Sequence, residues 1–433
     1  MEFKWEDKKL SEIGYIVTGK TPSTKIEKNF GDRVPFLTPS DDMDARYVYE
    51  TKRYLSDEGV NEVRKKLIPQ NSICISCIGS QLGKVTITTE ETVTNQQINS
   101  IVINDEYNIH FIYYLLLILG QKLNFLSKSS TAVPIINKKF FSEISVKVPQ
   151  RQLQDKIAIL LDSLDSKIEI NNKIISNLES QAQAIFKSWF VDFEPFQDGY
   201  FVESELGMIP EGWEVVELEE IADFSNGYSF KSKDLLEEKK SKNDYKVFKQ
   251  ADIKVGGGIN PNNTKSWIDS EFIRKNKLIR FIIQSGDLMM CMTDMKNNVR
   301  LLGNTALVYQ PDEYILNQRV GRLRSKQKDI KPSFLYYLTN NSVFLNDLRG
   351  RANTGVQVNL STSEIKRSKV ILPTCDIIKR FCDYSESITK SINSLNNQNT
   401  KLAELRDALL PKLMAGEIDV SNIKIEGEEV KNE

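Results

Sequence analysis

Residues Arg151 to Trp189 read RQLQDKIAILLDSLDSKIEINNKIISNLESQAQAIFKSW, 39 residues without proline or glycine. Apolar residues recur in this stretch at spacings of three and four, with one extra residue between Leu164 and Ile168, as at a stutter. The stretch therefore predicts one long helix, whose apolar stripe needs a second long helix or another chain to cover it. The stripe consists of Leu153, Ile157, Leu160, Leu164, Ile168, Asn171, Ile175, Leu178, Ala182, Ile185 and Trp189.

A second stretch, from Asp376 to Leu410, carries a similar stripe, and Pro411 is expected to stop or kink its helix. Asn399 falls on this stripe as Asn171 falls on the first, and a buried asparagine costs stability but fixes the register and the partner of a helix. We therefore expect the two helices to pair antiparallel within the chain and to hold apart the domains that precede them. The second stripe consists of Phe381, Ile388, Ile392, Leu395, Leu402, Leu405 and Leu409.

The chain contains an internal repeat. The pattern Trp-Glu-x-x-x-Leu-x-Glu-Ile begins at Trp5 and again at Trp213, and each copy ends in a glycine, Gly19 or Gly227, so that every pair lies 208 positions apart. Later landmarks recur with slightly larger offsets: Asn95-Gln96 with Asn317-Gln318, Phe111–Leu115 with Phe334–Leu338, and Val148-Pro149 with Leu372-Pro373. Such self-similarity indicates duplication, with insertions in loops.

Each repeat is predicted to begin with a mixed α/β domain. Short β-branched runs predict strands at 72–78, 84–88, 100–103, 288–292 and 305–309, and apolar runs predict helices at 111–123 and 333–346. The fold class is therefore α+β, with two similar mixed α/β domains separated by a long antiparallel two-helix coiled coil. The expected segments are a first domain 1–150, a helix 151–190, a linker 191–212, a second domain 213–374, a helix 375–413, and an acidic, fraying tail 414–433.

Composition limits the function classes. The 433 residues include 58 basic and 59 acidic side chains, so a DNA-binding chain of this composition must segregate its basic residues onto one face. The start lacks an apolar core and the most apolar run, 111–119, is too short to span a bilayer, which predicts a cytoplasmic protein without membrane contact. We interpret Cys74-x-x-Cys77 as part of a buried strand, because a zinc site needs two more ligands and His110 is the only histidine. We expect His110 to cap or pack a helix.

A literal match to the phosphate-loop pattern G-x-x-x-x-G-K-[ST], Gly14-Tyr-Ile-Val-Thr-Gly19-Lys20-Thr21, lies near the start. The mechanism needs a buried strand before the loop and a helix after it. The preceding WEDKKLSEI looks amphipathic and helical, and no apolar helix follows. The alternative is a glycine turn that presents Lys20, Thr21, Ser23 and Lys25 at a surface.

Basic and polar residues cluster in both predicted domains. Arg319, Arg322 and Arg324 are expected on one face of a strand, and the runs 80–84 and 295–300 carry the side-chain donors and acceptors that base-edge recognition needs. Each cluster is equally compatible with an ordinary solvated face or loop. No catalytic or metal-binding constellation is found, which favours recognition without chemistry. The candidate DNA-binding residues are Lys20, Thr21, Ser23, Lys25, Lys84, Lys231, Lys233, Lys296, Asn297, Asn298, Arg300, Arg319 and Arg322.

Three motifs carry a family resemblance. They are Ser188–Pro195 (SWFVDFEP) with Leu206–Trp213 (LGMIPEGW), Leu409–Ile418 (LLPKLMAGEI) and Thr18–Ser23 (TGKTPS). In this order within a two-repeat frame, the chain resembles the DNA-specificity subunit of a type I restriction–modification system over nearly its whole length. The chain departs from the family in two places. The Pro-Pro-x-x-Glu-Gln run that often opens each helix in the family is missing. The Gly-Thr-Pro-Ser-like turn is absent from the second repeat, which argues against a symmetric role for that turn.

The resemblance implies two target-recognition domains, each reading one half of a split double-stranded DNA site, with the helices as a spacer. It also implies docking of two modification subunits that use S-adenosylmethionine, on helix faces left apolar near Ile170 and Ile174, and of motor–nuclease restriction subunits that use ATP and Mg²⁺. This chain itself would bind no cofactor. Two alternatives remain: a coiled-coil scaffold with two protein-binding modules and no DNA role, favoured by the balanced charge, and a nucleotide-binding protein acting through Lys20.

Overall fold

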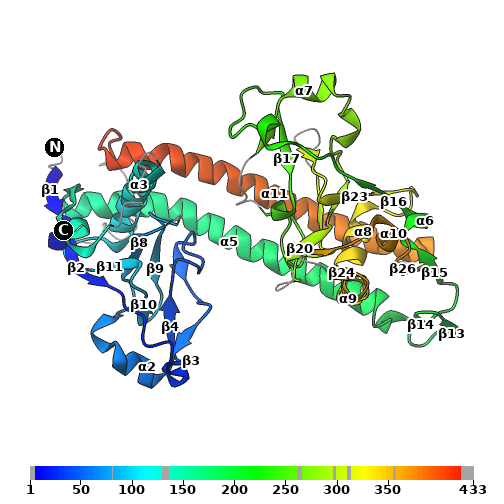
Figure 1. Ribbon diagram of the computed structural model, residues 1–433, viewed down its shortest axis with the longest axis horizontal. Coiled ribbons are helices and arrows are strands. Elements are labelled where there is room, and N and C mark those ends of the chain that lie inside the picture. Colours follow the sequence, from blue (N-terminus) through cyan, green and yellow to red (C-terminus); the bar gives the residue numbers. More distant parts are fainter. Residues whose placement is uncertain are drawn as a thin grey trace, which may run out of the picture. The chain divides into compact units, whose positions relative to one another are not determined.

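The computed structural model describes residues 5–79, 81–128, 136–260, 266–295, 299–309, 314–354 and 357–420. The chain forms two compact units: unit 1 contains Met1–Asn171 and Gln398–Glu433, and unit 2 contains Asn172–Asn397. Two long helices, α5 (Arg151–Phe190) and α11 (Cys375–Met414), each contribute one part to each unit (Figure 1). The units are divided within both helices, after Asn171 in α5 and before Gln398 in α11.

Three sheets lie within the described part of unit 1. A two-stranded antiparallel sheet joins the two ends of the first repeat, β1 (Trp5–Lys9) and β12 (Ser145–Pro149). One five-stranded sheet has the order β2 (Gly14–Thr18), β11 (Ile98–Ile103), β8 (Ile73–Ser76), β9 (Val85–Thr88), β5 (Tyr47–Val48). The other has the order β3 (Phe30–Gly31), β6 (Tyr54–Leu55), β4 (Val34–Leu37), β10 (Thr92–Thr94), β7 (Leu67–Ile68). The short helices are α1 (Leu10–Ile13), α2 (Asp57–Glu62) and α4 (Lys138–Glu143).

The core of unit 1 forms where α3 (Ile109–Lys128) covers β8 and β9 (Figure 1). Phe111, Tyr114 and Leu116 of α3 are completely buried in this core, together with Leu161 of α5 and Leu413 of α11. By length and composition alone, Ile109–Ser127 is the one candidate membrane span among the described residues. Because core helices pass the same test and the inner face of α3 is buried on a sheet, this is weak evidence for a membrane span.

Unit 2 repeats the plan of unit 1. The strands β15 (Glu214–Glu217) and β26 (Lys369–Leu372) pair antiparallel, as β1 and β12 do, and α6 (Leu218–Ile221) follows β15 as α1 follows β1. A four-stranded sheet has the order β16 (Ala222–Asn226), β23 (Val320–Ser325), β19 (Leu288–Cys291), β21 (Thr305–Leu307). Two three-stranded sheets have the orders β18 (Trp267–Ile268), β17 (Tyr245–Phe248), β22 (Tyr314–Leu316) and β20 (Thr293–Met295), β25 (Gln357–Asn359), β24 (Asn353–Thr354). Two further short helices of unit 2 are α7 (Ser270–Lys275) and α10 (Thr362–Lys366).

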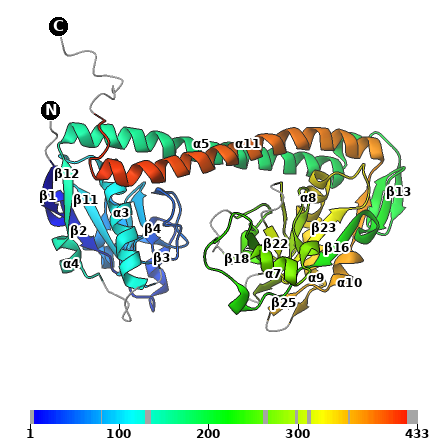
Figure 2. The same cartoon turned by 90° about the horizontal axis from the view of Figure 1, so that it is seen from above.

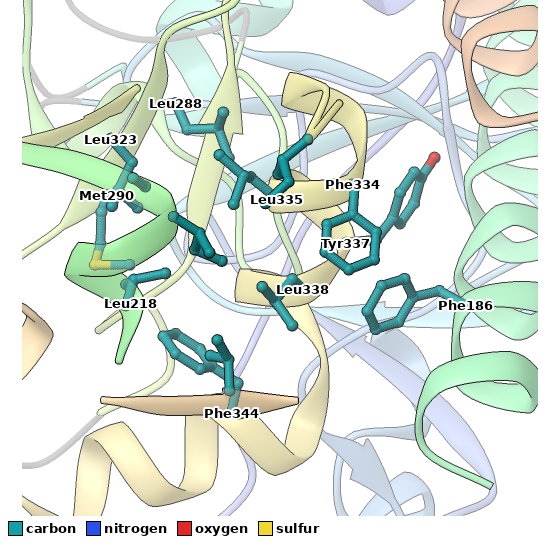
Figure 3. Close-up of a cluster of buried hydrophobic side chains, with 14 of the residues drawn as sticks. Phe186, Leu218, Leu288, Met290, Leu323, Phe334, Leu335, Tyr337, Leu338 and Phe344 are labelled. Atoms are coloured by element: carbon teal, nitrogen blue, oxygen red, sulfur yellow. The ribbon is translucent and has the colours of Figure 1, made fainter. Parts of the chain in front are cut away.

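The core of unit 2 is rich in aromatic rings. Phe334 and Tyr337 of α8 (Pro332–Asn340) face Phe186 of α5, with ring centroids 5.9 and 6.3 Å away (Figure 3). Phe381 of α11 lies 5.5 Å from Phe186. The predicted single helix 333–346 is two helices, because Asn341 ends α8 and caps α9 (Ser342–Gly350) by accepting a hydrogen bond from the backbone N–H of Phe344.

In each unit, parts of α5 and α11 lie side by side and run in opposite directions (Figure 2). The start of α5 meets the end of α11 in unit 1, and the end of α5 meets the start of α11 in unit 2. This confirms the predicted fold class of two similar mixed α/β bodies with a long antiparallel helix pair. Each helix buries more than the predicted stripe, because it also packs on strands and helices of its unit: Leu161 and Phe186 are more buried than Leu160 and Ile185.

Three local predictions are wrong. WEDKKLSEI is the strand β1 followed by the one-turn helix α1, because residues 5–9 pair with β12. Leu405, placed on the second stripe, is 47% exposed. The expected stop at Pro411 does not occur, because α11 continues to Met414.

The first residues after α11 do not fray, and residues 421–433 of the predicted tail lie outside the described residues. The N–H of Glu417 donates to the carbonyl of Lys412 and the N–H of Gly416 to that of Leu413, the paired bonds of a Schellman helix end. Gly416 has φ +72° and a Cβ there would lie 2.9 Å from Nε1 of Trp5, so this position requires glycine. Val420 is buried in the unit 1 core. The motif Leu413–Glu417 (LMAGE) therefore ends α11 and packs it against Trp5 of β1.

The predicted linker 191–212 is also structured. It contains a 3₁₀ turn, η3 (Glu194–Phe196), and a hairpin of β13 (Phe201–Ser204) and β14 (Gly207–Pro210). Trp213, which opens the second repeat, packs against the rings of Phe193 and Phe196 at 5.5 and 5.1 Å. The segment after α5 thus packs on Trp213, which directly precedes β15.

Candidate nucleic-acid interface

Two landmarks of the first repeat, Gly19 and Asn95-Gln96, form one structural feature. The N–H of Gly19 donates to the carbonyl of Ile98 at 3.2 Å, and the N–H of Lys20 donates to the carbonyl of Thr94 at 2.9 Å. A Cβ at Gly19 would lie 2.2 Å from the carbonyl oxygen of Asn95, so only glycine allows this approach. The two turns are thereby pressed together at the end of β2.

The second repeat forms the same feature from Gly227 and Asn317-Gln318. A Cβ at Gly227 would lie 2.3 Å from the carbonyl oxygen of Asn317. The N–H of Tyr228 donates to the carbonyl of Leu316, and the N–H of Gln318 donates back to the carbonyl of Tyr228, each at 3.0 Å. We call these features the paired turns: residues 19–23 with 95–97 in unit 1, and residues 227–230 with 317–319 in unit 2.

The paired turns of unit 1 present polar side chains to solvent. Lys20 and Gln96 are exposed, and the hydroxyl of the half-buried Thr21 donates to Oε1 of Gln96 at 2.8 Å. Ser23 instead braces the loop, because its N–H donates to Glu62 at 3.0 Å and its carbonyl accepts from Asn29 at 3.0 Å. Lys25 is exposed in the following turn. Lys20, Thr21 and Gln96 therefore form the accessible part of this turn pair.

The same geometry argues against nucleotide binding at Lys20. A phosphate loop uses free backbone N–H groups and the start of a helix to hold phosphates. Here the N–H groups of Gly19 and Lys20 are both bonded to carbonyls of neighbouring strands. The next helical element is the three-residue 3₁₀ turn η1 (Glu27–Asn29), and no α-helix begins at Thr21.

Lys84 lies apart from the paired turns, directly before β9. Its half-buried ammonium is 2.5 Å from Oδ2 of Asp44. A lysine already paired with a carboxylate offers less of its charge to a phosphate, so Lys84 is the weaker candidate in unit 1.

Arg319, Arg322 and Arg324, which were expected on one face of a strand, do not share that face. The strand β23 begins at Val320, so Arg319 precedes the strand and lies exposed in the paired turns. Alternate residues of a strand share a face, so Arg322 and Arg324 lie on one face to which position 319 does not belong. Arg322 is half-buried and donates from Nη1 to the carbonyl of Arg280 at 3.0 Å. Arg324 holds the buried Asp287 with two bonds of 2.7 and 2.9 Å. Burial and the neighbouring charge of Arg324 lower the pKa of Arg322.

A residue outside the candidate list joins the paired turns of unit 2. Arg280 is exposed, its guanidinium stacks on the ring of Phe281 at 4.8 Å, and Phe281 lies 5.7 Å from the ring of Tyr228. The sequence placed Arg280 in a basic cluster but gave no sign that its neighbour Phe281 would pack on Tyr228.

The remaining candidates of unit 2 are dispersed. Lys231 and Lys233 are exposed at the 3₁₀ turn η4 (Ser232–Asp234), which directly follows residues 227–230. Arg300 is exposed, and its carbonyl accepts a bond from Nη2 of Arg349 at 2.7 Å. Lys296, Asn297 and Asn298 lie outside the described residues.

Cys74, Cys77 and His110, which were considered for metal or acid–base chemistry, make contacts that stabilise the fold. Burial raises the pKa of Cys74 to about 12 and that of Cys77 to about 11, and both belong to hydrophobic clusters, as predicted. His110 bonds through Nε2 to the hydroxyl of Tyr47 at 3.0 Å and through Nδ1 to Asp162. It packs α3 rather than capping it, since Asn108 accepts the bond from the N–H of Phe111. Among the described residues, no group of three His, Cys, Asp or Glu side chains could hold a metal ion.

Comparison with known proteins gives one consistent result. A family model described as the type I restriction modification DNA specificity domain matches residues 2–180 and 210–405. The type I restriction enzyme MjaIX specificity subunit of Methanocaldococcus jannaschii is 26% identical over 440 residues, covering 97% of this chain and 94% of that protein. The HindI specificity subunit of Haemophilus influenzae is 36% identical over 180 residues, covering 40% of this chain and 39% of that protein.

A solved structure has the same fold. The crystal structure of the type I restriction–modification S subunit from M. genitalium matches with a TM-score of 0.50 and 16% identity, covering 95% of this chain and 96% of that one. At this identity the likeness supports the arrangement of elements and says nothing about individual contact residues.

Proposed function

This chain belongs to the type I restriction modification DNA specificity family, and from that premise we propose that units 1 and 2 each read one half of a split double-stranded DNA site. The observation that carries this proposal is the duplication of the paired turns. Gly19 with Asn95 and Gly227 with Asn317 build the same close contact, while the side chains presented beside it differ.

The differing side chains suit two different half-sites. Unit 1 presents Lys20, Thr21 and Gln96, and unit 2 presents Tyr228 and Arg319 with Arg280 nearby. Lysine, arginine and glutamine carry the donors that bind phosphates and base edges, whereas the backbone of the turns only positions them. A shared frame with different exposed side chains is what recognition of two unrelated half-sites requires.

The long helices supply the second part of the proposal, the spacer between half-sites. Because α5 and α11 each contribute to both units, a change in helix length affects both units at once. We propose that the number of heptads sets the number of unread base pairs, since DNA turns about once in 10.5 bp and each unit must meet its own groove face.

The partners follow from the family and from the helix surface. We propose that two modification subunits, which carry S-adenosylmethionine, dock on apolar side chains that helix pairing leaves exposed. In unit 1 these are Ile159 and Ile170, which are 43% and 51% exposed, and in unit 2 Ile174, which is 39% exposed. Motor–nuclease restriction subunits would bring ATP and Mg²⁺. The chain would have no active site of its own and would work in the cytoplasm, away from membranes.

A DNA-binding measurement with matched variants tests the proposal. With modification subunits present, affinity for a DNA fragment that contains the target should fall steeply as salt rises, because bound lysines and arginines displace counterions. Lys20→Gln should weaken binding and flatten the salt slope by about one charge. Lys147→Gln, which alters an exposed lysine on β12 outside the paired turns, should change neither. Absence of DNA binding at any salt concentration would favour the scaffold alternative.

A further inference from the structure

In unit 1 the side chain of Arg46 connects the globular part to α5. Its guanidinium donates from Nε and Nη2 to the two carboxylate oxygens of Glu169, at 2.8 and 2.9 Å. Nη1 donates to Asp162 at 2.5 Å, and Nη2 also donates to the hydroxyl of Ser166 at 3.1 Å. A single side chain thus makes four bonds to three α5 residues.

The backbone of Arg46 is fixed just as firmly to the sheet. Its carbonyl accepts a bond from the N–H of Ile87 in β9 at 2.8 Å, and β5 begins at the next residue. Its side chain is only 7% exposed. Burial alone would lower the pKa of Arg46, but the bond to Glu169 and the charges of Asp162 and Glu169 outweigh it and raise that pKa. The guanidinium is therefore charged, enclosed and held in one orientation.

The α5 residues that receive these bonds belong to a regular acidic row. Asp155, Asp162 and Glu169 are seven positions apart, so they lie along one face of the helix. Each receives a different donor from the globular part of unit 1: the amide of Asn108 bonds to Asp155 at 2.7 Å, His110 bonds to Asp162, and Arg46 bonds to Glu169. Hydrogen bonds of this kind are directional, so the row specifies a rotation as well as a position.

The part of α5 in unit 2 meets its globular part largely through rings, with Phe186 and Phe190 lying 5.9 and 5.4 Å from Phe334. Ring contacts bury area but constrain direction less than a two-bond guanidinium–carboxylate pair. The bonds to the acidic row therefore constrain the orientation of the globular part of unit 1 on α5 more than the ring contacts constrain that of unit 2.

We propose that Arg46 is the positioning residue that fixes the orientation of the first recognition domain on α5. By fixing this orientation, Arg46 restricts recognition of the first half-site to DNA in which a single spacer length separates the two half-sites. The inference rests on the proposed function. Arg46 does not read DNA itself, because its guanidinium is buried against α5. Loss of its bonds to Asp162, Ser166 and Glu169 leaves the paired turns of unit 1 intact. The first recognition domain can then adopt a range of orientations relative to α5.

The test uses the chain assembled with its modification subunits and a library of DNA substrates whose two half-sites are separated by different spacers. With Arg46→Met, the half-site sequences should stay the same, while methylation of substrates with one base pair more or less should rise about tenfold relative to the native spacer. Arg46→Lys should rescue partly, because a lysine can reach one carboxylate but cannot form the two-bond pair. Arg33→Met is the matched control, since Arg33 pairs with Asp57 on the exposed surface of the same unit.

Unchanged spacer selectivity in Arg46→Met, with normal methylation of the native target, would overturn the proposal. If Arg46→Met does not fold, Glu169→Gln replaces it, because Glu169 is 36% exposed and its loss leaves the bonds to Asp162 and Ser166 in place. Glu169→Gln should show the same change more weakly, and native selectivity in that variant would equally overturn the proposal. Failure of the proposed function looks different: the wild-type complex would then methylate no two-part site at all.

Discussion

Asn171 of α5 donates a hydrogen bond from Nδ2 to Oδ1 of Asn399 of α11, across 2.8 Å, in the interior of unit 1. The same amide also donates to Oε1 of Gln398 at 2.7 Å, and the Asn171 side chain is completely buried. The two asparagines that fell on the two sequence stripes are therefore direct partners. Because a polar pair between helices is satisfied in one alignment only, we expect this contact to fix the register of α5 against α11.

Replacing Asn171 by leucine should lower the free energy of unfolding by about 1–3 kcal/mol, because Gln398 and Asn399 lose their shared donor. Replacing Asn171 and Asn399 together by leucine should recover most of that loss, since an apolar pair leaves no broken bond between them. Urea unfolding followed by circular dichroism measures both changes. Lys173→Leu, at an exposed neighbouring position, is the control and should change little. Equal losses in the single and double variants would contradict the paired role.

Arg319 and Arg324 provide a matched pair for separating DNA recognition from stability. Arg319→Gln should weaken DNA binding about tenfold and leave the melting temperature unchanged, because Arg319 is exposed in the paired turns. Arg324→Met should instead lower stability by about 1–3 kcal/mol, because it removes two donors from the buried Asp287. Gel shifts and thermal melts on both variants distinguish the roles, and a reversed pattern would mean that the paired turns do not face DNA.

Glu179 should make unit 2 less stable as the pH rises. Burial raises the pKa of this α5 carboxyl above its ordinary value of 4.5, and Lys254 offsets this only in part. The folded state therefore holds a proton more tightly than the unfolded state, and stability falls as pH rises from about 4.5 through the folded-state pKa. Glu179→Gln should melt at a higher temperature than wild type at pH 7, with the difference shrinking as the pH approaches 4.5. A difference that is constant with pH would contradict this.

The five cysteines should react unequally. Cys375 is exposed at the start of α11, whereas the other four are buried, and burial raises the pKa of Cys74 and Cys291 to about 12. Since the thiolate is the reactive form, iodoacetamide should modify Cys375 in the folded chain and all five residues only in denaturant. Mass spectrometry after trypsin digestion reads this directly. Rapid native labelling of Cys74 would show that β8 is not the buried strand described.

The repeat was the most informative part of the sequence, for a physical reason. Gly19 and Asn95 recur as Gly227 and Asn317. In each repeat the asparagine carbonyl oxygen lies so close to the glycine that a Cβ there would be only 2.2 or 2.3 Å away, so both positions require glycine. The offset between the repeats grows from 208 at the glycine to 222 at the asparagine, so residues are inserted between these two landmarks in the second repeat. The sequence pattern therefore predicted both domains, though it did not predict that each glycine would touch its own asparagine.

Periodicity predicted the helices but only one of their buried faces. A heptad pattern follows the side that meets the partner helix, so it favoured Leu160 and Ile185 over Leu161 and Phe186, which pack on the globular parts. The acidic row at Asp155, Asp162 and Glu169 was visible in the sequence at the same seven-residue spacing. Nothing near Arg46 in the sequence indicated that it would meet this row, because the contact spans 116 to 123 positions.

The most direct test of the account is the methylation pattern left on genomic DNA by the complex after residues 213–374 are replaced with the corresponding domain of a relative. Single-molecule sequencing reads both halves of each modified site. We expect the half-site read by unit 1 and the spacer length to remain, and the other half-site to change to that of the donor. A change in both half-sites, or in neither, would contradict the claim that each unit reads one half of the DNA target.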